Sequence, residues 1–174
     1  HFGCAVDFPE DQTCCGQPAF NEGFWEESRT IARKFLKDMD TPDYIVAPSG
    51  SCTGFIRNYY KKLFDEVEMP EVRQFYEFTE FLTGVIGMDD VGATLEGVAA
   101  YHDACGALRE CGIREAPRKL LSHVKGLELR ETVDCEVCCG FGGTFSVKFE
   151  PISTGMAEQK VLNAIERGAE YIIS

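Results

Sequence analysis

Basic side chains are scarce in this chain, which has 17 Lys and Arg against 29 Asp and Glu and a formal net charge of −12. Nucleic-acid binding depends on Lys and Arg that neutralise phosphates, so the composition argues against a nucleic-acid partner. No apolar run approaches the roughly 18 residues that a membrane-spanning helix needs, so no membrane span is predicted. Neither the P-loop nor the Gly-x-Gly-x-x-Gly pattern is present, which leaves no predicted nucleotide site.

Cysteine, by contrast, is abundant, with nine residues in the chain. The count is odd and no apolar signal segment precedes the first cysteine, so we expect reduced thiols rather than a secreted disulfide framework. Cys-Cys-Gly occurs twice, at residues 14–16 and 138–140. A disulfide between adjacent cysteines is strained, whereas both thiolates can bind one metal cluster. The duplicated motif therefore predicts two metal-binding turns.

The surroundings of the two motifs also repeat. Alternating residues at 3–7 and 126–130 predict a short strand before each motif. β-branched residues predict another strand some distance after each motif, at 43–47 and 170–174. The strand before the first motif contains Cys4, which aligns with a leucine in the second repeat, so we expect Cys4 to lie in the core.

A helix is predicted between each motif and the strand that follows it. Asn21 can cap a helix over 21–38, and Pro151 can open a helix that Gly168 ends. Apolar residues recur at helical spacing on both helices: Phe24, Ile31, Ala32 and Phe35 on the first, and Ala157, Val161, Ala164 and Ile165 on the second. Strands joined by helices in this way are typical of parallel sheets.

We therefore expect an α/β fold with two similar lobes, each a parallel sheet flanked by helices, related by a pseudo-two-fold internal repeat. The Gly- and Asp-rich segment 88–97 is the expected boundary, with a first repeat at 1–87 and a second at 88–174. The region between the motifs is predicted to contain helices and one strand, namely helices at 55–64, 75–85 and 116–124 and a strand at 98–102.

Two further cysteines follow predicted strands. Cys52 comes shortly after strand 43–47, and Cys105 comes directly after strand 98–102. Open α/β sheets gather ligands at the carboxyl ends of their strands. The sequence thus predicts two groups of candidate metal ligands: Cys14, Cys15 and Cys52 in the first repeat, and Cys105, Cys138 and Cys139 in the second.

The remaining candidates are weaker. Cys111 is expected at a helix end, and Cys135 could reach the metal but has a polar counterpart in the first repeat. His102 could tune a cluster or relay a proton, or it could simply hydrogen-bond to backbone. The glycines after Cys139 are expected to let backbone N–H groups approach a cluster.

Four stretches carry a resemblance to a known family: CCGQPAFNEGFW, VAPSGSC, YHDAC and CCGFGGTFSVKF. They sample nearly the whole chain, and the sequence resembles the cysteine-rich CCG domain proteins, which include iron–sulfur subunits related to heterodisulfide reductase and glycolate oxidase. The resemblance implies iron–sulfur clusters, of the 4Fe-4S type, on the six cysteines named above. The family's spacing implies one further ligand before His1 and one after Ser174.

The resemblance also implies a function. We expect an electron-transfer subunit of a soluble cytoplasmic complex that oxidises L-lactate to pyruvate, in which other subunits carry out the substrate chemistry. Three alternatives stay open. Cysteine thiolates suit zinc equally well, at one of the sites or in a zinc-binding structural or assembly protein. A disulfide oxidoreductase would use the vicinal cysteines directly, and a cluster-dependent disulfide reductase subunit would use the same six residues.

Overall fold

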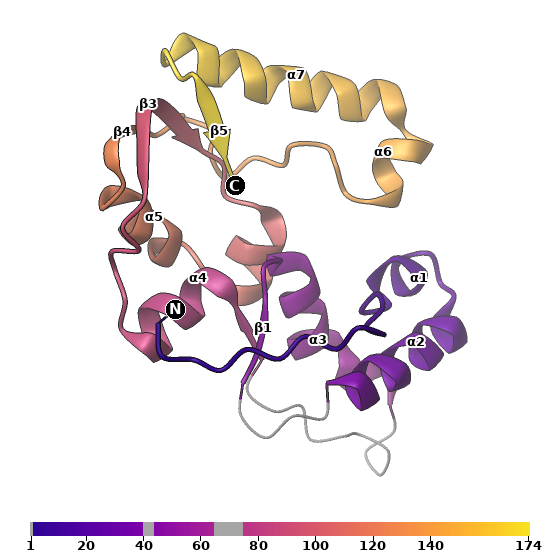
Figure 1. Ribbon diagram of the computed structural model, residues 1–174. Coiled ribbons are helices and arrows are strands. Elements are labelled where there is room, and N and C mark those ends of the chain that lie inside the picture. The colour runs from indigo at the N-terminus through magenta and orange to yellow at the C-terminus, as the bar shows by residue number, and fades with distance from the viewer. Residues whose placement is uncertain (1, 40–43, 65–74) are drawn as a thin grey trace.

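The computed structural model describes residues 2–39, 44–64 and 75–174. It is an α/β structure with two small parallel sheets flanked by helices (Figure 1). In the first sheet β1 (Ile45–Ala47) pairs in parallel with β2 (Phe75–Glu77). In the second, β3 (Thr94–Tyr101) lies between β4 (Lys125–Arg130) and β5 (Tyr171–Ile173), again in parallel. The predicted fold class is confirmed.

Helices cover the first sheet and enclose an aromatic core. α1 (Gln17–Asn21) and α2 (Trp25–Asp38) follow the first Cys-Cys-Gly turn, and α3 (Gly50–Leu63) follows β1. The core cluster joins side chains from α2, α3 and β2, and Cys15 belongs to it: Ala32, Phe35, Phe55, Ile56, Tyr60, Leu63, Phe64 and Phe75. The first Cys-Cys-Gly turn is therefore anchored in the packed core by the side chain of Cys15.

The second half of the chain repeats this order with some differences. α5 (Glu115–Ser122) precedes β4, and α6 (Thr144–Lys148) and α7 (Glu150–Glu166) follow the second Cys-Cys-Gly turn. Pro151 lies in the first turn of α7, and Gly168 adopts φ 71° just after its end, as predicted. Within the described residues, no helix combines the length and apolarity that a bilayer crossing requires.

Several sequence-based expectations are wrong. Residues 3–7 form no strand, and Cys4 is exposed rather than buried. Figure 1 shows this N-terminal segment running extended outside both sheets. Val6 is 87% exposed, so alternating residues here have no core to cover. A strand requires a hydrogen-bonded neighbour, and none of the described strands pairs with this segment.

The prediction of a single helix over 75–85 is also wrong. The segment begins with strand β2, which is followed by a single helical turn, α4 (Phe78–Glu80), and by a π-helix, η1 (Phe81–Ile86). Pairing with β1 overrides the helical spacing at its start. The helix predicted over 21–38 is divided, because Asn21 ends α1 and α2 begins only at Trp25. Asp43, in the predicted strand 43–47, lies outside the described residues.

The two repeats meet where α3 crosses a second π-helix, η2 (Gly106–Glu110). A Cβ atom on Gly50 would lie 2.5 Å from the backbone nitrogen of Ala107, and one on Gly106 would lie 2.6 Å from Ser51 Cα. Only glycine permits this approach of the two backbones. A hydrogen bond of 2.8 Å from Asn58 Nδ2 to the Glu110 carbonyl closes the other end of the contact.

We expect Gly50→Ala to destabilise the protein by about 1–3 kcal/mol, because backbone must move to admit the methyl group. Gly155→Ala on α7 is the matched control, since its Cβ would meet nothing within 4 Å. There, alanine should be neutral or stabilising by up to about 1 kcal/mol. Urea unfolding of both variants measures the difference, and equal stability of the two would contradict the tight crossing.

Candidate metal centre

All nine cysteines are free thiols in this structure. In the first Cys-Cys-Gly turn Cys14 is exposed, while Cys15 is 4% exposed. The Tyr60 hydroxyl, fully buried on α3, donates a hydrogen bond of 2.8 Å to the Cys15 carbonyl. Helix α3 thus contacts the first turn through Tyr60 and also carries the third predicted ligand, Cys52.

The thiols of Cys15 and Cys52 lie close enough to interact. Their interaction is the largest cause that raises the pKa of Cys15 and lowers the pKa of Cys52 to about 6. The hydroxyls of Ser49 and Ser51 add to the lowering at Cys52. Cys52 lies in the first turn of α3, where Ser49 is the N-cap residue. A thiolate at this position is the form that binds metal.

The second repeat forms its own thiol pair from different members. The Cys105 thiol, at the start of η2, lies close enough to interact with the thiols of Cys138 and Cys139. Burial, followed by the neighbouring thiolates, raises the pKa of Cys105. In each repeat the structure therefore brings one cysteine of the Cys-Cys pair into contact with the distant cysteine predicted to join it.

Backbone N–H groups point to the first thiol of each pair. Gly16 N donates to Cys14 Sγ and Gly140 N donates to Cys138 Sγ, both at 3.4 Å. The two glycines have φ of 95° and 84°, a conformation that L side chains rarely adopt. Amide donors near sulfur stabilise negative charge on a bound cluster, and both turns present such a donor to their first sulfur.

The other candidates have structural partners. Cys111 ends η2, as predicted, and its thiol donates to the Gly50 carbonyl at 3.5 Å; burial raises its pKa to about 11. The Cys135 thiol hydrogen-bonds to the buried carboxylate of Asp103. His102 Nδ1 lies 3.1 Å from the Cys135 carbonyl, and burial lowers the pKa of this imidazole. A backbone hydrogen bond was one of the two expectations for His102.

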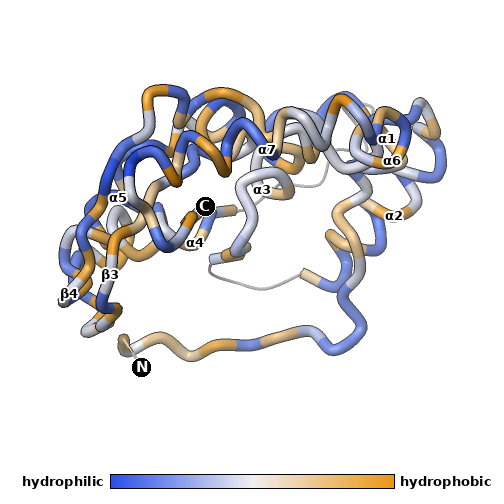
Figure 2. The backbone as a smooth tube through the Cα atoms, turned by 90° about the horizontal axis from the view of Figure 1, so that it is seen from above, coloured by the Kyte–Doolittle hydropathy of each residue, from blue (hydrophilic) through white to orange (hydrophobic). Residues whose placement is uncertain are grey.

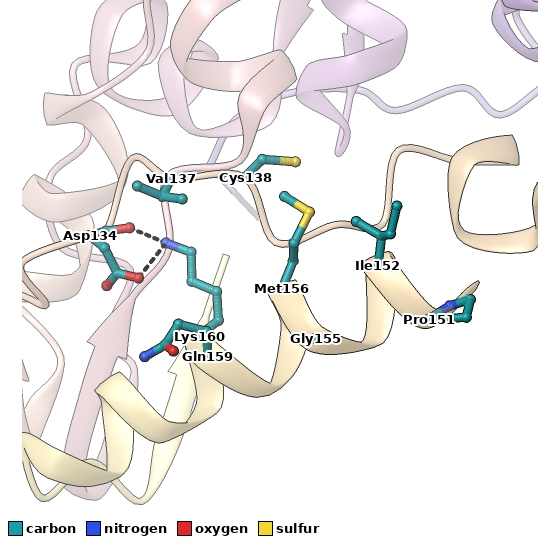
Figure 3. Close-up of a pocket in the computed structure, with 9 residues that line it drawn as sticks. All are labelled: Asp134, Val137, Cys138, Pro151, Ile152, Gly155, Met156, Gln159 and Lys160. Carbon is teal, nitrogen blue, oxygen red and sulfur yellow. Dashed lines mark hydrogen bonds and ion pairs between the residues drawn. The ribbon is translucent and has the colours of Figure 1, made fainter. Parts of the chain in front are cut away.

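A cavity of about 340 Å³ adjoins Cys138, between residues 134–138 and one face of α7 (Figure 3). Val137, Ile152 and Met156 form an apolar part of its wall. Lys160 spans the cavity's other end, donating to the Asp134 carbonyl and lying 3.9 Å from the Asp134 carboxylate. Of the candidate ligands, Cys138 is the one that lines this cavity.

The two sites lie on adjoining parts of the molecule. Cys52 and Cys105 stand on the two segments that cross at Gly50 and Gly106. Seen from above in Figure 2, α6 and α1 overlap, and Lys148 at the end of α6 forms an ion pair with Glu22, the residue after α1. The two repeats thus contact each other through the same elements that carry or follow the cysteines.

The donor chemistry of these residues fits a thiolate-bound metal. Soft sulfur ligands select iron–sulfur clusters and zinc. The described His, Cys, Asp and Glu side chains contain no group of three or more already placed around one ion. Each turn instead presents a contacting pair with the remaining cysteine beside it in the chain. The six cysteines are therefore candidate ligands, and their role as ligands stays a prediction.

Sequence reasoning missed Ser28 and Ser153, which contact the two turns from α2 and α7. Ser28 Oγ donates to the Gly16 carbonyl, and Ser153 Oγ donates to the Gly140 carbonyl. A pattern common to both repeats could have identified them, since each serine is four residues after a phenylalanine that precedes the helix.

Comparison with known proteins agrees with the cysteine pattern. A family model described as a cysteine-rich domain, CCG, matches residues 2–57 and 99–174. Lactate utilization protein A of Geobacillus kaustophilus (strain HTA426) is 44% identical over 176 residues, covering 98% of this chain and 74% of that protein. Lactate utilization protein A 1 of Bacillus cereus (strain AH820) shows the same identity and coverage. No solved structure matches the chain. With matches over both repeats, the chain belongs to the cysteine-rich CCG domain family, as a homologue of the lactate utilization protein A sequences.

Proposed function

We propose that this protein is an iron–sulfur electron-transfer subunit of a cytoplasmic complex that oxidises L-lactate to pyruvate. The observation that carries the proposal is the pair of thiol contacts, Cys15 with Cys52 and Cys105 with Cys138, one at each Cys-Cys-Gly turn. The lactate part rests on similarity to proteins named for lactate utilization.

The residues around each thiol pair suit electron transfer. Cys14, Cys15 and Cys52 would hold one cluster, and Cys105, Cys138 and Cys139 the other. When bound, an iron–sulfur cluster supplies one-electron transfer. The chain contributes the thiolates, the amide donors of Gly16 and Gly140, and the aromatic core that packs against Cys15. Removal of hydride from lactate would fall to other subunits, which are the proposed partners.

The test is anaerobic reconstitution of the whole chain with iron and sulfide, followed by iron, sulfide and zinc analysis. We expect visible absorbance from bound iron and sulfide, bleached by dithionite. L-lactate alone should leave that absorbance unchanged, because the substrate chemistry is assigned to partner subunits. Bound zinc without iron or sulfide would instead support a zinc-binding structural protein. Bleaching by lactate alone would contradict the assignment of lactate oxidation to other subunits.

A further inference from the structure

A buried serine holds each Cys-Cys-Gly turn at the same atom. The Ser28 hydroxyl donates to the Gly16 carbonyl at 2.9 Å, and the Ser153 hydroxyl donates to the Gly140 carbonyl at 2.8 Å. Ser28 is 0% exposed and Ser153 is 9% exposed. A buried hydroxyl without a partner is costly, so each serine is held to its turn by its surroundings.

The recurrence extends to the helices that carry the serines. Ser28 N donates to the Phe24 carbonyl at 2.9 Å, and Ser153 N donates to the Phe149 carbonyl at 3.0 Å. Both serines therefore occupy the same position in the first turn of the second helix after the motif, α2 or α7. The other residues of these helix starts differ between the repeats, Trp-Glu-Glu in one and Glu-Pro-Ile in the other. The serine and the phenylalanine four residues before it are what the two helix starts share.

The glycine of each turn lies close to the backbone of the serine that binds its carbonyl. A Cβ on Gly140 would lie 2.7 Å from the Ser153 carbonyl oxygen, and one on Gly16 would lie 3.0 Å from the Ser28 carbonyl oxygen. Each glycine is thus packed against the serine that binds its carbonyl. Its N–H in turn donates to the first thiol of the pair, at 3.4 Å in both repeats.

We propose that Ser28 and Ser153 are positioning residues that set the metal affinity of their Cys-Cys-Gly turns. Each serine acts through its glycine, whose orientation aims an amide donor at the sulfur of Cys14 or Cys138. The inference rests on the metal-binding role proposed above. A serine that only packs would change stability and leave the affinity of the folded protein for metal unchanged.

The test uses Co²⁺ as the probe, because its thiolate charge-transfer absorbance reports binding whether the resident metal is iron or zinc. Reduced whole chain is titrated anaerobically as wild type, Ser28→Ala and Ser153→Ala. Each alanine variant should lose about tenfold or more in Co²⁺ affinity at one of the sites and keep the other, as expected when a group that orients a ligand is removed. Ser153→Thr, which retains a hydroxyl, should keep most of the affinity.

Ser146→Ala is the matched control. Ser146 Oγ also donates to a glycine carbonyl at 2.8 Å, that of Gly143, but outside the Cys-Cys-Gly turn. Far-UV circular dichroism checks that each variant is folded, and Ser28→Ala decides the question if Ser153→Ala does not fold. Wild-type affinity in folded alanine variants, or equal losses in Ser146→Ala, would overturn the positioning role alone. Absence of any thiolate-bound Co²⁺ in the wild type would overturn the metal-binding proposal with it.

Discussion

Cys138→Ser is expected to remove about half of the iron that the reconstituted protein binds, since one of two sites loses a thiolate. Cys138 is the residue at which three observations meet: contact with the Cys105 thiol, an amide donor from Gly140, and the open cavity beside α7. A serine hydroxyl is a hard and weakly acidic group, so it replaces a soft thiolate poorly. The first repeat has its own thiols and should keep its iron.

Cys4→Ser is the control for this prediction. Cys4 is exposed in the N-terminal segment, so its replacement should change neither iron content nor stability. The comparison is iron and sulfide per chain after identical anaerobic reconstitution, with thermal unfolding of each apoprotein. Equal iron loss in the two variants would contradict the assignment of Cys138 to a metal site and of Cys4 to an exposed position.

Arg118→Met is expected to cost about 3–5 kcal/mol of folding stability, the range for leaving a buried charge without its partner. The two terminal guanidinium nitrogens of Arg118 lie 2.8 and 2.7 Å from the carboxylate of Asp103, which is 1% exposed. Asp103 in turn joins the end of β3 to the segment before Cys138, through a backbone hydrogen bond of 3.1 Å to Cys135. Loss of Arg118 should therefore also loosen the second thiol pair.

The Asp103–Arg118 ion pair also makes the folding stability depend on pH. The Arg118 hydrogen bonds hold the pKa of Asp103 below its usual range. The stabilisation is therefore present above the unfolded-state pKa, about 3.9, and is lost as pH falls through the folded-state value. Wild type should lose stability on acidification below about pH 4 more steeply than Arg118→Met.

Arg114→Met provides the comparison for Arg118→Met. Arg114 is half exposed and pairs with the exposed Glu136, so its loss should cost at most about 1 kcal/mol. Urea unfolding at neutral and acid pH measures all three proteins. Similar midpoints for the two variants at neutral pH would show that the Asp103 carboxylate does not depend on its buried partner.

The features that sequence alone predicted are those with a local physical cause. Proline and glycine mark the ends of α7, because each restricts or frees a single backbone position. The alternation in β4 and the β-branched residues of β1 and β5 are short-range patterns too. The duplicated Cys-Cys-Gly motif was visible for the same reason, and with it the α/β class and two repeats.

The tertiary structure decided which of these local tendencies prevail and which atoms meet. Residues 3–7 have the alternation of a strand but no described neighbour to pair with, and 75–77 leave a helical pattern to pair with β1. The thiol contacts differ between the repeats, Cys15 with Cys52 but Cys138 with Cys105, so the packing decides which cysteine of each adjacent pair meets the distant one. The serines that hold the turns share a local pattern in the two repeats, but their hydrogen bonds across 12 or 13 residues depend on packing rather than on local sequence.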